Sequence, residues 1–226
     1  VAKKIYEELG GSSPILKLTK EQSVALEATL NQTQTEDQYK CFIVMRCWNP
    51  RAQDVIKDVQ LYGPEEIILM PLYPQYSAAT SGSSIKEWKG VCKKNNYNIK
   101  TSTICCYPTD QNFINAHTKE IIKKTQDLKN FKLIFSAHGL PEKNIKNGDP
   151  YQWQVEQSVK KIVTKLNDEN LDWVLSYQSR VGPLKWIGPS TEDTIIENSK
   201  IGKHIVLVPI AFVSEHSETL VELDIE

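Results

Sequence analysis

The stretch LIFSAHGLP, residues 133–141, carries the clearest indication of the fold in this sequence. It begins with three large apolar residues, continues through Ser136 to His138, and breaks at Gly139 and Pro141. A continuous apolar run that ends at Gly and Pro is typical of a strand covered on both faces of a parallel sheet. The histidine therefore stands where the strand ends. It either satisfies a buried carbonyl there or serves a site at that edge of the sheet.

Five further runs have the same apolar character, and amphipathic stretches of helical length separate them. This alternation of strand and helix predicts an α/β fold with parallel sheets and right-handed crossovers. The first run is the predicted strand 132–138. The other predicted strands are 41–46, 66–73, 101–107, 173–179 and 204–212, and the predicted helices are 19–34, 50–61, 83–96, 109–128, 150–167 and 190–201.

The six strands form two groups of three, divided by the helical stretch 109–128. This grouping predicts two similar lobes, 1–108 and 109–226. The chain opens at Val1 inside one helical pattern and stops inside another, so we expect a piece of a longer protein in which each lobe lacks one strand.

Composition excludes several classes of protein. The 226 residues carry a net charge of −1, without the basic excess that nucleic-acid binding requires. No apolar run approaches the roughly 20 residues of a transmembrane helix, and no signal peptide is visible. The 5 cysteines have no C-x-x-C spacing, which favours reduced thiols in a cytosolic compartment over a disulfide framework or a zinc site.

Large aromatic residues and an arginine follow the strands, at the edge where α/β folds bind ligands. Arg46 and Trp48 follow the first strand, Tyr76 lies in a loop rich in small residues after the second, and Trp186 follows the fifth. Each residue alone could be a packing residue or a surface ion pair. Together they describe a pocket for a large, flat, apolar ligand with acidic groups.

The last segment, FVSEHSETLVELDIE (212–226), predicts a helix that Ser214 caps and that continues to the end of the chain. Glu218, Glu222 and Glu226 recur on one face of that helix. This acidic stripe is either a solvated face or a path that a divalent cation follows inward.

His216 and Glu218 are two residues apart and do not share a face of a regular α-helix. If both serve one site, the junction between them must be non-α, for example a π-bulge.

Several of these motifs together resemble the ferrochelatase family, which inserts ferrous iron into a porphyrin to make haem. The resemblance extends over essentially the whole chain. The motifs are GGSSPI (10–15), YPQYSAATSGSS (73–84), LIFSAHGLP (133–141), NGDPY (147–151), SRVGPLKWIGPST (179–191) and VPIAFVSEHSETLVELDIE (208–226).

The resemblance implies two Rossmann-like, chelatase-type lobes with a porphyrin cleft between them. It places His138 and Glu218 at the catalytic positions, and it leaves open which takes protons and which guides the metal. The implied metal residues are His138, His216, Glu218, Glu222 and Glu226, and the residues that line the porphyrin pocket are Arg46, Tyr76, Ser179 and Trp186, to which the strand-end pattern adds Trp48.

This chain departs from the family pattern at three positions. Cys47 stands where many members have tyrosine, and Gly139 replaces a common serine, which we expect to loosen that turn. Ala78 stands where animal relatives have a cysteine ligand of an iron–sulfur cluster, so we expect no such cluster in this region.

The resemblance implies insertion of Fe²⁺, as a substrate, into protoporphyrin IX with release of two protons. Coproporphyrin as the substrate, a non-catalytic porphyrin- or metal-binding module, and a metal-dependent hydrolase are the alternatives. The sequence has no H-E-x-x-H motif, which disfavours the metal-dependent hydrolase. We expect a cytoplasmic protein with peripheral membrane association through missing segments, mitochondrial if the source is eukaryotic, and a regulatory divalent cation on the acidic stripe.

Overall fold

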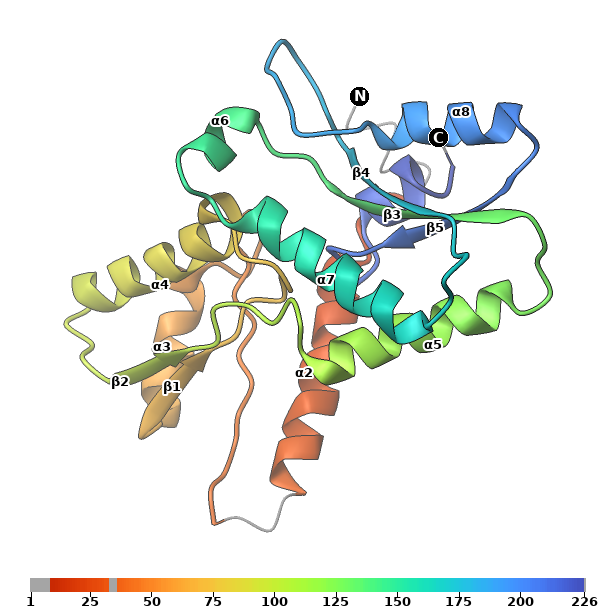
Figure 1. Cartoon of the computed structure of the whole chain (residues 1–226). Helices are drawn as coiled ribbons and strands as arrows, with labels where there is room; N and C mark the ends of the chain where they lie inside the picture. The colour runs from red at the N-terminus through yellow and green to blue at the C-terminus, as the bar shows by residue number, and fades with distance from the viewer. Residues whose placement is uncertain (1–8, 33–35, 226) are drawn as a thin grey trace. The chain divides into compact units, whose positions relative to one another are not determined.

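The computed structural model describes residues 9–32 and 36–225 (Figure 1). Its contacts divide the chain into two compact units. The first unit comprises Val1–Pro71, Ala79–Cys105 and Ser214–Glu226, and the second comprises Leu72–Ala78 and Cys106–Val213. The main boundary lies close to residue 108. However, Leu72–Ala78, from the first half of the chain, belongs to the second unit, and Ser214–Glu226, from the end of the chain, belongs to the first. The division into lobes at 108 stays a prediction.

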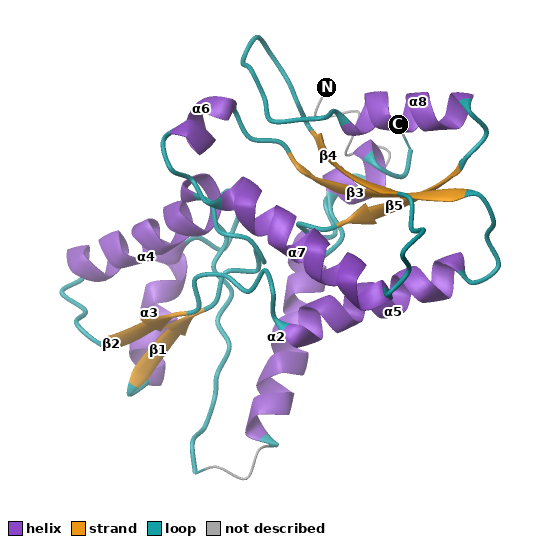
Figure 2. Ribbon diagram, in the orientation of Figure 1, coloured by secondary structure: helices purple, strands orange, loops and turns teal. Residues whose placement is uncertain are grey.

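The second unit is built on a parallel three-stranded sheet with β3 in the middle (Figure 2). Strand β3 (Phe131–His138) pairs with β4 (Trp173–Gln178) on one side and with β5 (His204–Pro209) on the other. These are the predicted strands 132–138, 173–179 and 204–212, so their identification from continuous apolar runs is confirmed.

Helices cover both faces of this sheet. Helices α5 (Gln111–Thr125) and α7 (Tyr151–Leu166) lie on one face, α8 (Thr191–Lys200) lies on the other, and a short α6 (Glu142–Lys146) follows β3 (Figure 1). The hydrophobic core lies between β3 and the pair α5 and α7. Its most buried members include Leu133, Phe135, Ala137, Val155 and Ile162.

The first unit contains a parallel pair of strands, β1 (Glu66–Leu69) and β2 (Lys100–Thr103). Its helices are α2 (Ile15–Asn31), α3 (Ala52–Tyr62) and α4 (Ser83–Lys94), and a π-helical turn, η1 (Ala78–Gly82), leads into α4. A small core joins α3 and α4 through Val55, Ile56, Val59 and Trp88.

The prediction of a strand at 41–46 is wrong. This segment is extended but belongs to no strand, and β1 pairs only with β2 in the described part of the first unit. An apolar, extended segment becomes a strand only when a neighbour satisfies its backbone N–H and C=O groups. Met45 instead donates its amide to the Pro50 carbonyl at 2.7 Å, which closes a local turn.

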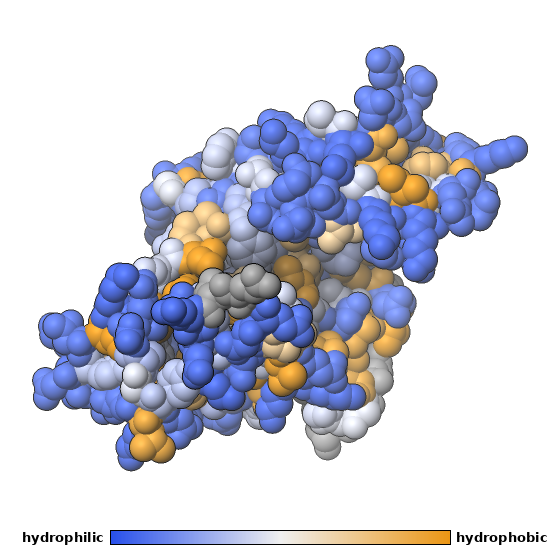
Figure 3. All heavy atoms as spheres, turned by 90° about the horizontal axis from the view of Figure 1, so that it is seen from below, coloured by the Kyte–Doolittle hydropathy of each residue, from blue (hydrophilic) through white to orange (hydrophobic). Residues whose placement is uncertain are grey.

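The surface seen in Figure 3 is mostly hydrophilic, with apolar residues in separate clusters. Within 9–32 and 36–225, the structure contains no helix with the length and hydropathy needed to cross a membrane.

Candidate active site

His138 is the last residue of β3 and lies opposite Gln178 of β4 in the parallel register. The ring is half-buried, and its Nδ1 lies 2.6 Å from the Gly139 carbonyl oxygen. A proton on Nδ1 fits this contact, because a carbonyl oxygen can only accept. Nε2 is then the ring nitrogen that carries the lone pair. The histidine thus satisfies a carbonyl at the end of the strand, and its role as a base stays a prediction.

A layer of buried polar side chains lies on the same face of the sheet as His138. The Ser136 hydroxyl donates to Gln178 Oε1 at 2.6 Å and lies 2.9 Å from the Thr191 hydroxyl. The Ser176 hydroxyl also lies 2.9 Å from Thr191. These contacts tie the ends of β3 and β4 to the first residue of α8. They hold the backbone at His138 in a fixed register.

The turn after His138 is tightly packed. The Gly139 amide donates to the Gln178 carbonyl at 2.8 Å, and a Cβ atom on Gly139 would lie 2.9 Å from that carbonyl oxygen and 3.3 Å from the Trp186 ring. Such distances force neighbouring atoms to move. The expectation that Gly139 loosens this turn is therefore wrong for this chain.

Trp186 reaches this turn through a short antiparallel pairing. Pro141 and Trp186 form an isolated bridge, and the Ile187 amide donates to the Leu140 carbonyl at 3.0 Å. The indole Nε1 donates to the Val181 carbonyl at 3.1 Å, which fixes the ring plane. The structure therefore brings Trp186 to the strand end that carries His138.

Ser179 directly follows Gln178 and adopts a left-handed backbone conformation, with φ of 57°. A non-glycine residue at positive φ is uncommon and occurs often at functional sites. His138, Ser179 and Trp186 thus gather at the carboxyl ends of β3 and β4. Tyr76 belongs to the same unit, on the segment Leu72–Ala78.

The first unit holds Arg46 beside a carboxylate. Arg46 Nε lies 3.3 Å from Glu87 Oε2, an ion pair without hydrogen-bond geometry, and Arg51 Nη2 lies 2.6 Å from Glu87 Oε1. Two guanidinium groups share one carboxylate, and a second carboxylate, that of Asp54, accepts from the Arg51 backbone amide at 2.9 Å. Trp48 nearby in sequence is 64% exposed.

His216 and Glu218 are neighbours in the first unit, with Nε2 of the histidine 3.7 Å from Oε1 of the glutamate. The junction between them is non-α, as a shared site requires. A π-helical turn, η2 (Glu218–Glu222), begins at Glu218, and the Leu223 amide donates to the Glu218 carbonyl five residues earlier at 3.2 Å.

The prediction that Ser214 caps a regular helix to residue 226 is wrong. The turn begins after Ser217 and ends at Glu222, and the Ser214 hydroxyl is buried with no hydrogen-bond partner among the described residues. The N-cap residue is Ser217, which makes no side-chain capping bond, and Thr219 inside the turn instead accepts from the His216 amide at 3.0 Å and donates to the Glu215 carboxylate.

Only part of the acidic stripe can be placed. Glu218 and Glu222 are half-buried on η2, while Glu226 lies outside the described residues. In the part of the chain that the structure describes, no three His, Cys, Asp or Glu side chains converge to hold a metal ion. The stripe as a cation path stays a prediction.

The sequence matches the model of the Ferrochelatase family over residues 1–226. The chain belongs to the ferrochelatase family. It is 86% identical to the ferrochelatase of Pelagibacter ubique strain HTCC1062, over 100% of this chain and 66% of that protein. It is 51% identical to the ferrochelatase of Rickettsia bellii strain OSU 85-389, over 100% of this chain and 62% of that protein. The chain therefore spans about two thirds of the length of the curated relatives it matches.

The fold also resembles a solved structure, SirB from Bacillus subtilis with Fe³⁺, with a TM-score of 0.57. The likeness covers 90% of this chain and 75% of that chain, at 15% sequence identity. It supports the α/β architecture of parallel sheets flanked by helices, and the predicted fold class is confirmed.

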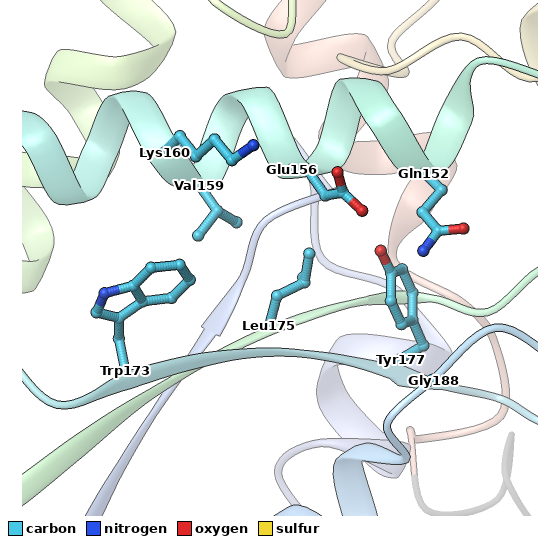
Figure 4. A pocket seen from close by; sticks show the side chains of 8 residues that line it. All are labelled: Gln152, Glu156, Val159, Lys160, Trp173, Leu175, Tyr177 and Gly188. Atoms are coloured by element: carbon cyan, nitrogen blue, oxygen red, sulfur yellow. The ribbon is translucent and has the colours of Figure 1, made fainter.

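A cavity of about 260 Å³ in the second unit lies between α7 and β4 (Figure 4), and His138 is not among its lining residues. It is lined by Trp173, Leu175 and Tyr177 of β4, which alternate with the strand residues that face α8, and by side chains of α7 such as Glu156. Burial, with Glu156 as the smaller cause, raises the pKa of Tyr177. In this member of the ferrochelatase family the cavity therefore lies on the opposite face of the sheet from the His138 side chain.

Two groups with strongly shifted pKa values are not among the residues implied by the ferrochelatase resemblance. Burial lowers the pKa of His117 to about 4 and raises that of Tyr107 to about 12. Both rings pack edge-to-face on Phe113, with centroid distances of 4.7 and 6.0 Å.

Sequence reasoning missed the residues that hold the site residues in place. Glu87 orders the arginines, Thr219 orders His216, and Ser136 with Thr191 supports the end of β3. A threonine three residues after His216 resembles a capping pattern, and could have been found. The contact of Glu87 with Arg46 joins distant parts of the sequence, and no local pattern predicts it.

Proposed function

We propose that this protein inserts Fe²⁺ into protoporphyrin IX to form haem, as a lyase that makes nitrogen–metal bonds. The observation that carries the proposal is the gathering of His138, Ser179 and Trp186 at one strand edge in a chain of the ferrochelatase family. A base and an aromatic wall at one edge suit a reaction that deprotonates a flat macrocycle.

Iron insertion must remove two N–H protons from the porphyrin while four ring nitrogens bind the ion. A neutral imidazole accepts a proton near neutral pH, and Nε2 of His138 is the nitrogen that carries the lone pair. Two proton transfers balance the charge, because the dianionic ring and Fe²⁺ give neutral haem and two protons leave.

Glu218 and His216 form a second pair of donors, in the first unit. The two side chains lie 3.7 Å apart, and the buried Thr219 holds His216 in place. Together they offer a carboxylate and an imidazole to an incoming divalent cation. Glu222 and Glu226 belong with Glu218 to the acidic stripe, where we propose that a regulatory divalent cation also binds. The His138→Ala variant described in the Discussion tests whether His138 takes the protons.

The porphyrin contacts proposed for this chain are aromatic and cationic. Trp186, Trp48 and Tyr76 supply ring surfaces, and Arg46 supplies a guanidinium for a propionate. Binding against such walls can hold the ring out of plane and expose a nitrogen lone pair. Arg46 shares Glu87 with Arg51, so a propionate would take the place of part of this ion pair at the Arg46 guanidinium.

The experiment that tests this proposal uses the chain completed at both ends with the sequence that the Pelagibacter relative has beyond the matched region. Loss of porphyrin fluorescence on addition of Fe²⁺ or Zn²⁺ measures insertion, and fluorescence titration without metal measures binding. Protoporphyrin and coproporphyrin are compared in parallel, because coproporphyrin is the alternative substrate. Binding of both porphyrins without insertion of either metal would favour a non-catalytic binding module.

We also propose a cytoplasmic location with peripheral membrane association, and no iron–sulfur cluster in this region of the chain. Sedimentation with vesicles and the visible absorption spectrum of the purified protein test these two points.

A further inference from the structure

A short segment from the first half of the chain, residues 75–77, is fastened along α7 by polar contacts. Gln75 is 1% exposed, and its amide Nε2 donates to the Ser158 hydroxyl at 3.0 Å. The Tyr76 backbone amide donates to Gln154 Oε1 at 2.7 Å. Gln154 and Ser158 lie four residues apart on one face of α7. Consecutive residues of the segment therefore contact positions one turn apart on that face of α7.

Asp149, in the NGDPY motif just before α7, makes the third contact of this series. Its Oδ2 accepts from the Ser77 hydroxyl at 2.8 Å and from the Ala78 amide at 2.9 Å. Its Oδ1 accepts from the Tyr151 amide, in the first turn of α7, at 3.1 Å. One carboxylate thus joins the end of the segment to the start of the helix. Hydrogen bonds to a charged acceptor are stronger than neutral ones.

Burial alternates along the segment. Gln75 and Ser77 are each 1% exposed, whereas Tyr76 between them is only half-buried. The side chains on both sides of Tyr76 make the anchoring contacts and hold its backbone, whereas the tyrosine side chain takes part in none of these hydrogen bonds.

We propose that Asp149 is a positioning residue for porphyrin binding, which acts by holding the backbone at residues 77–78 so that the Tyr76 ring is presented to the substrate. This inference rests on the proposed function, because it assigns Tyr76 to the porphyrin pocket. Asp149 itself touches no substrate. A carboxylate suits the role because three donors converge on its two oxygens, and an asparagine has only one accepting oxygen.

The experiment measures equilibrium binding of protoporphyrin to the completed protein and its Asp149→Asn variant. We expect the Kd to rise by about tenfold or more, the range for loss of a hydrogen bond to a charged group. The iron KM at saturating porphyrin should stay within about twofold, because the anchor acts through Tyr76 and not through the metal residues.

A matched control separates positioning from helix capping. Asp110 caps α5 of the same unit, where its side chain accepts from the Asn112 and Phe113 amides and makes no hydrogen bond to residues 75–78 in the described structure. Asp110→Asn should lower thermal stability about as much as Asp149→Asn and leave porphyrin affinity unchanged. Equal losses of affinity in the two variants would overturn the proposal.

A double-mutant cycle tests the route of the effect. In a Tyr76→Ala background the further loss caused by Asp149→Asn should shrink to less than about twofold, because the ring being positioned is gone. A tenfold loss that persists without the Tyr76 ring would show that Asp149 acts elsewhere.

Ser77→Ala removes one contact to Asp149 and keeps the carboxylate and the bond to Tyr151. We expect it to weaken porphyrin binding by about threefold or more, and unchanged affinity would overturn the proposal even if Asp149→Asn fails to fold. The two proposals fail separately. A completed wild type that inserts no metal contradicts the proposed function, whereas an active wild type with an indifferent Asp149→Asn variant contradicts only this inference.

Discussion

Lowering the pH from 7.5 to 5 should destabilise the second unit by about 2 kcal/mol through one side chain, His117. This histidine lies on α5, edge-to-face with Phe113 at a centroid distance of 4.7 Å. Burial disfavours the charged imidazolium and lowers the pKa of His117 from 6.5 to about 4.

The sign and size follow from proton linkage. The unfolded chain binds a proton at His117 below pH 6.5, but the folded protein binds it only near pH 4. The free energy of unfolding is therefore constant above pH 6.5 and falls as the pH drops toward 4. At pH 5 the proton-binding polynomial of His117 is about 30 times larger in the unfolded than in the folded state. This ratio corresponds to a loss of about 2 kcal/mol in the free energy of unfolding.

The assay is urea denaturation at half-unit steps from pH 7.5 to 5, on the wild type and on a His117→Leu variant. Leucine keeps an apolar side chain of similar size and removes the titration. The carboxylates with lowered pKa values, such as Glu27 and Asp172, lose their contribution only as the pH falls below about 4.5, so this window isolates the histidine. Parallel pH profiles for the two proteins would refute the reasoning.

The outcome matters for any pH profile of metal insertion. A fall in activity below pH 6.5 would ordinarily be assigned to the catalytic base. The folded protein also loses stability over the same pH interval because of His117. Only the pH profile of the His117→Leu variant therefore reports the titration of the catalytic groups.

Four further predictions concern the site. His138→Ala should abolish metal insertion and leave porphyrin affinity within about twofold, as measured by fluorescence; near-normal turnover in a folded variant would remove the general-base role. Trp186→Ala should weaken porphyrin binding by about 1.5–3 kcal/mol, the value of a buried large side chain, and an unchanged titration would make Trp186 an ordinary packing residue. Gly139→Ala should lower the free energy of unfolding by about 1–3 kcal/mol, because its Cβ would lie 2.9 Å from the Gln178 carbonyl oxygen; a variant that melts with the wild type would show that the turn can relax. Glu222→Gln should remove the thermal stabilisation that added Mg²⁺ or Zn²⁺ gives the wild type and raise the KM for iron, and identical responses of both proteins to cation would leave the stripe a solvated face.

Local patterns were sufficient for most of the fold. Strands β3, β4 and β5 are continuous apolar runs because both faces of their sheet are covered by helices. Such runs can be recognised in the sequence alone. The segment 41–46 has the same pattern, but a strand also needs a neighbour, and pairing is not encoded locally. Ser214 does not cap this segment because the turn begins only after Ser217, three residues further on.

The site divides in the same way. His138 could be found because a histidine directly after a buried strand is a local feature. The support for Tyr76 could not, since Ser77 and Asp149 are 72 positions apart in sequence and meet only after α7 has docked. Residues that position others are chosen by tertiary contacts, and their types are common ones such as serine, glutamine and aspartate.

The placement of Leu72–Ala78 in the second unit has a consequence for how the chain is made. Gln75 leaves the ribosome 83 residues before Ser158, its hydrogen-bond partner, and cannot settle until α7 has been synthesised. The first unit must wait longer, since it includes Ser214–Glu226 as well as the earliest residues. Folding during translation therefore cannot proceed one half after the other. Contacts of such high sequence separation slow folding and leave apolar surface exposed in the nascent chain, where chaperones would bind.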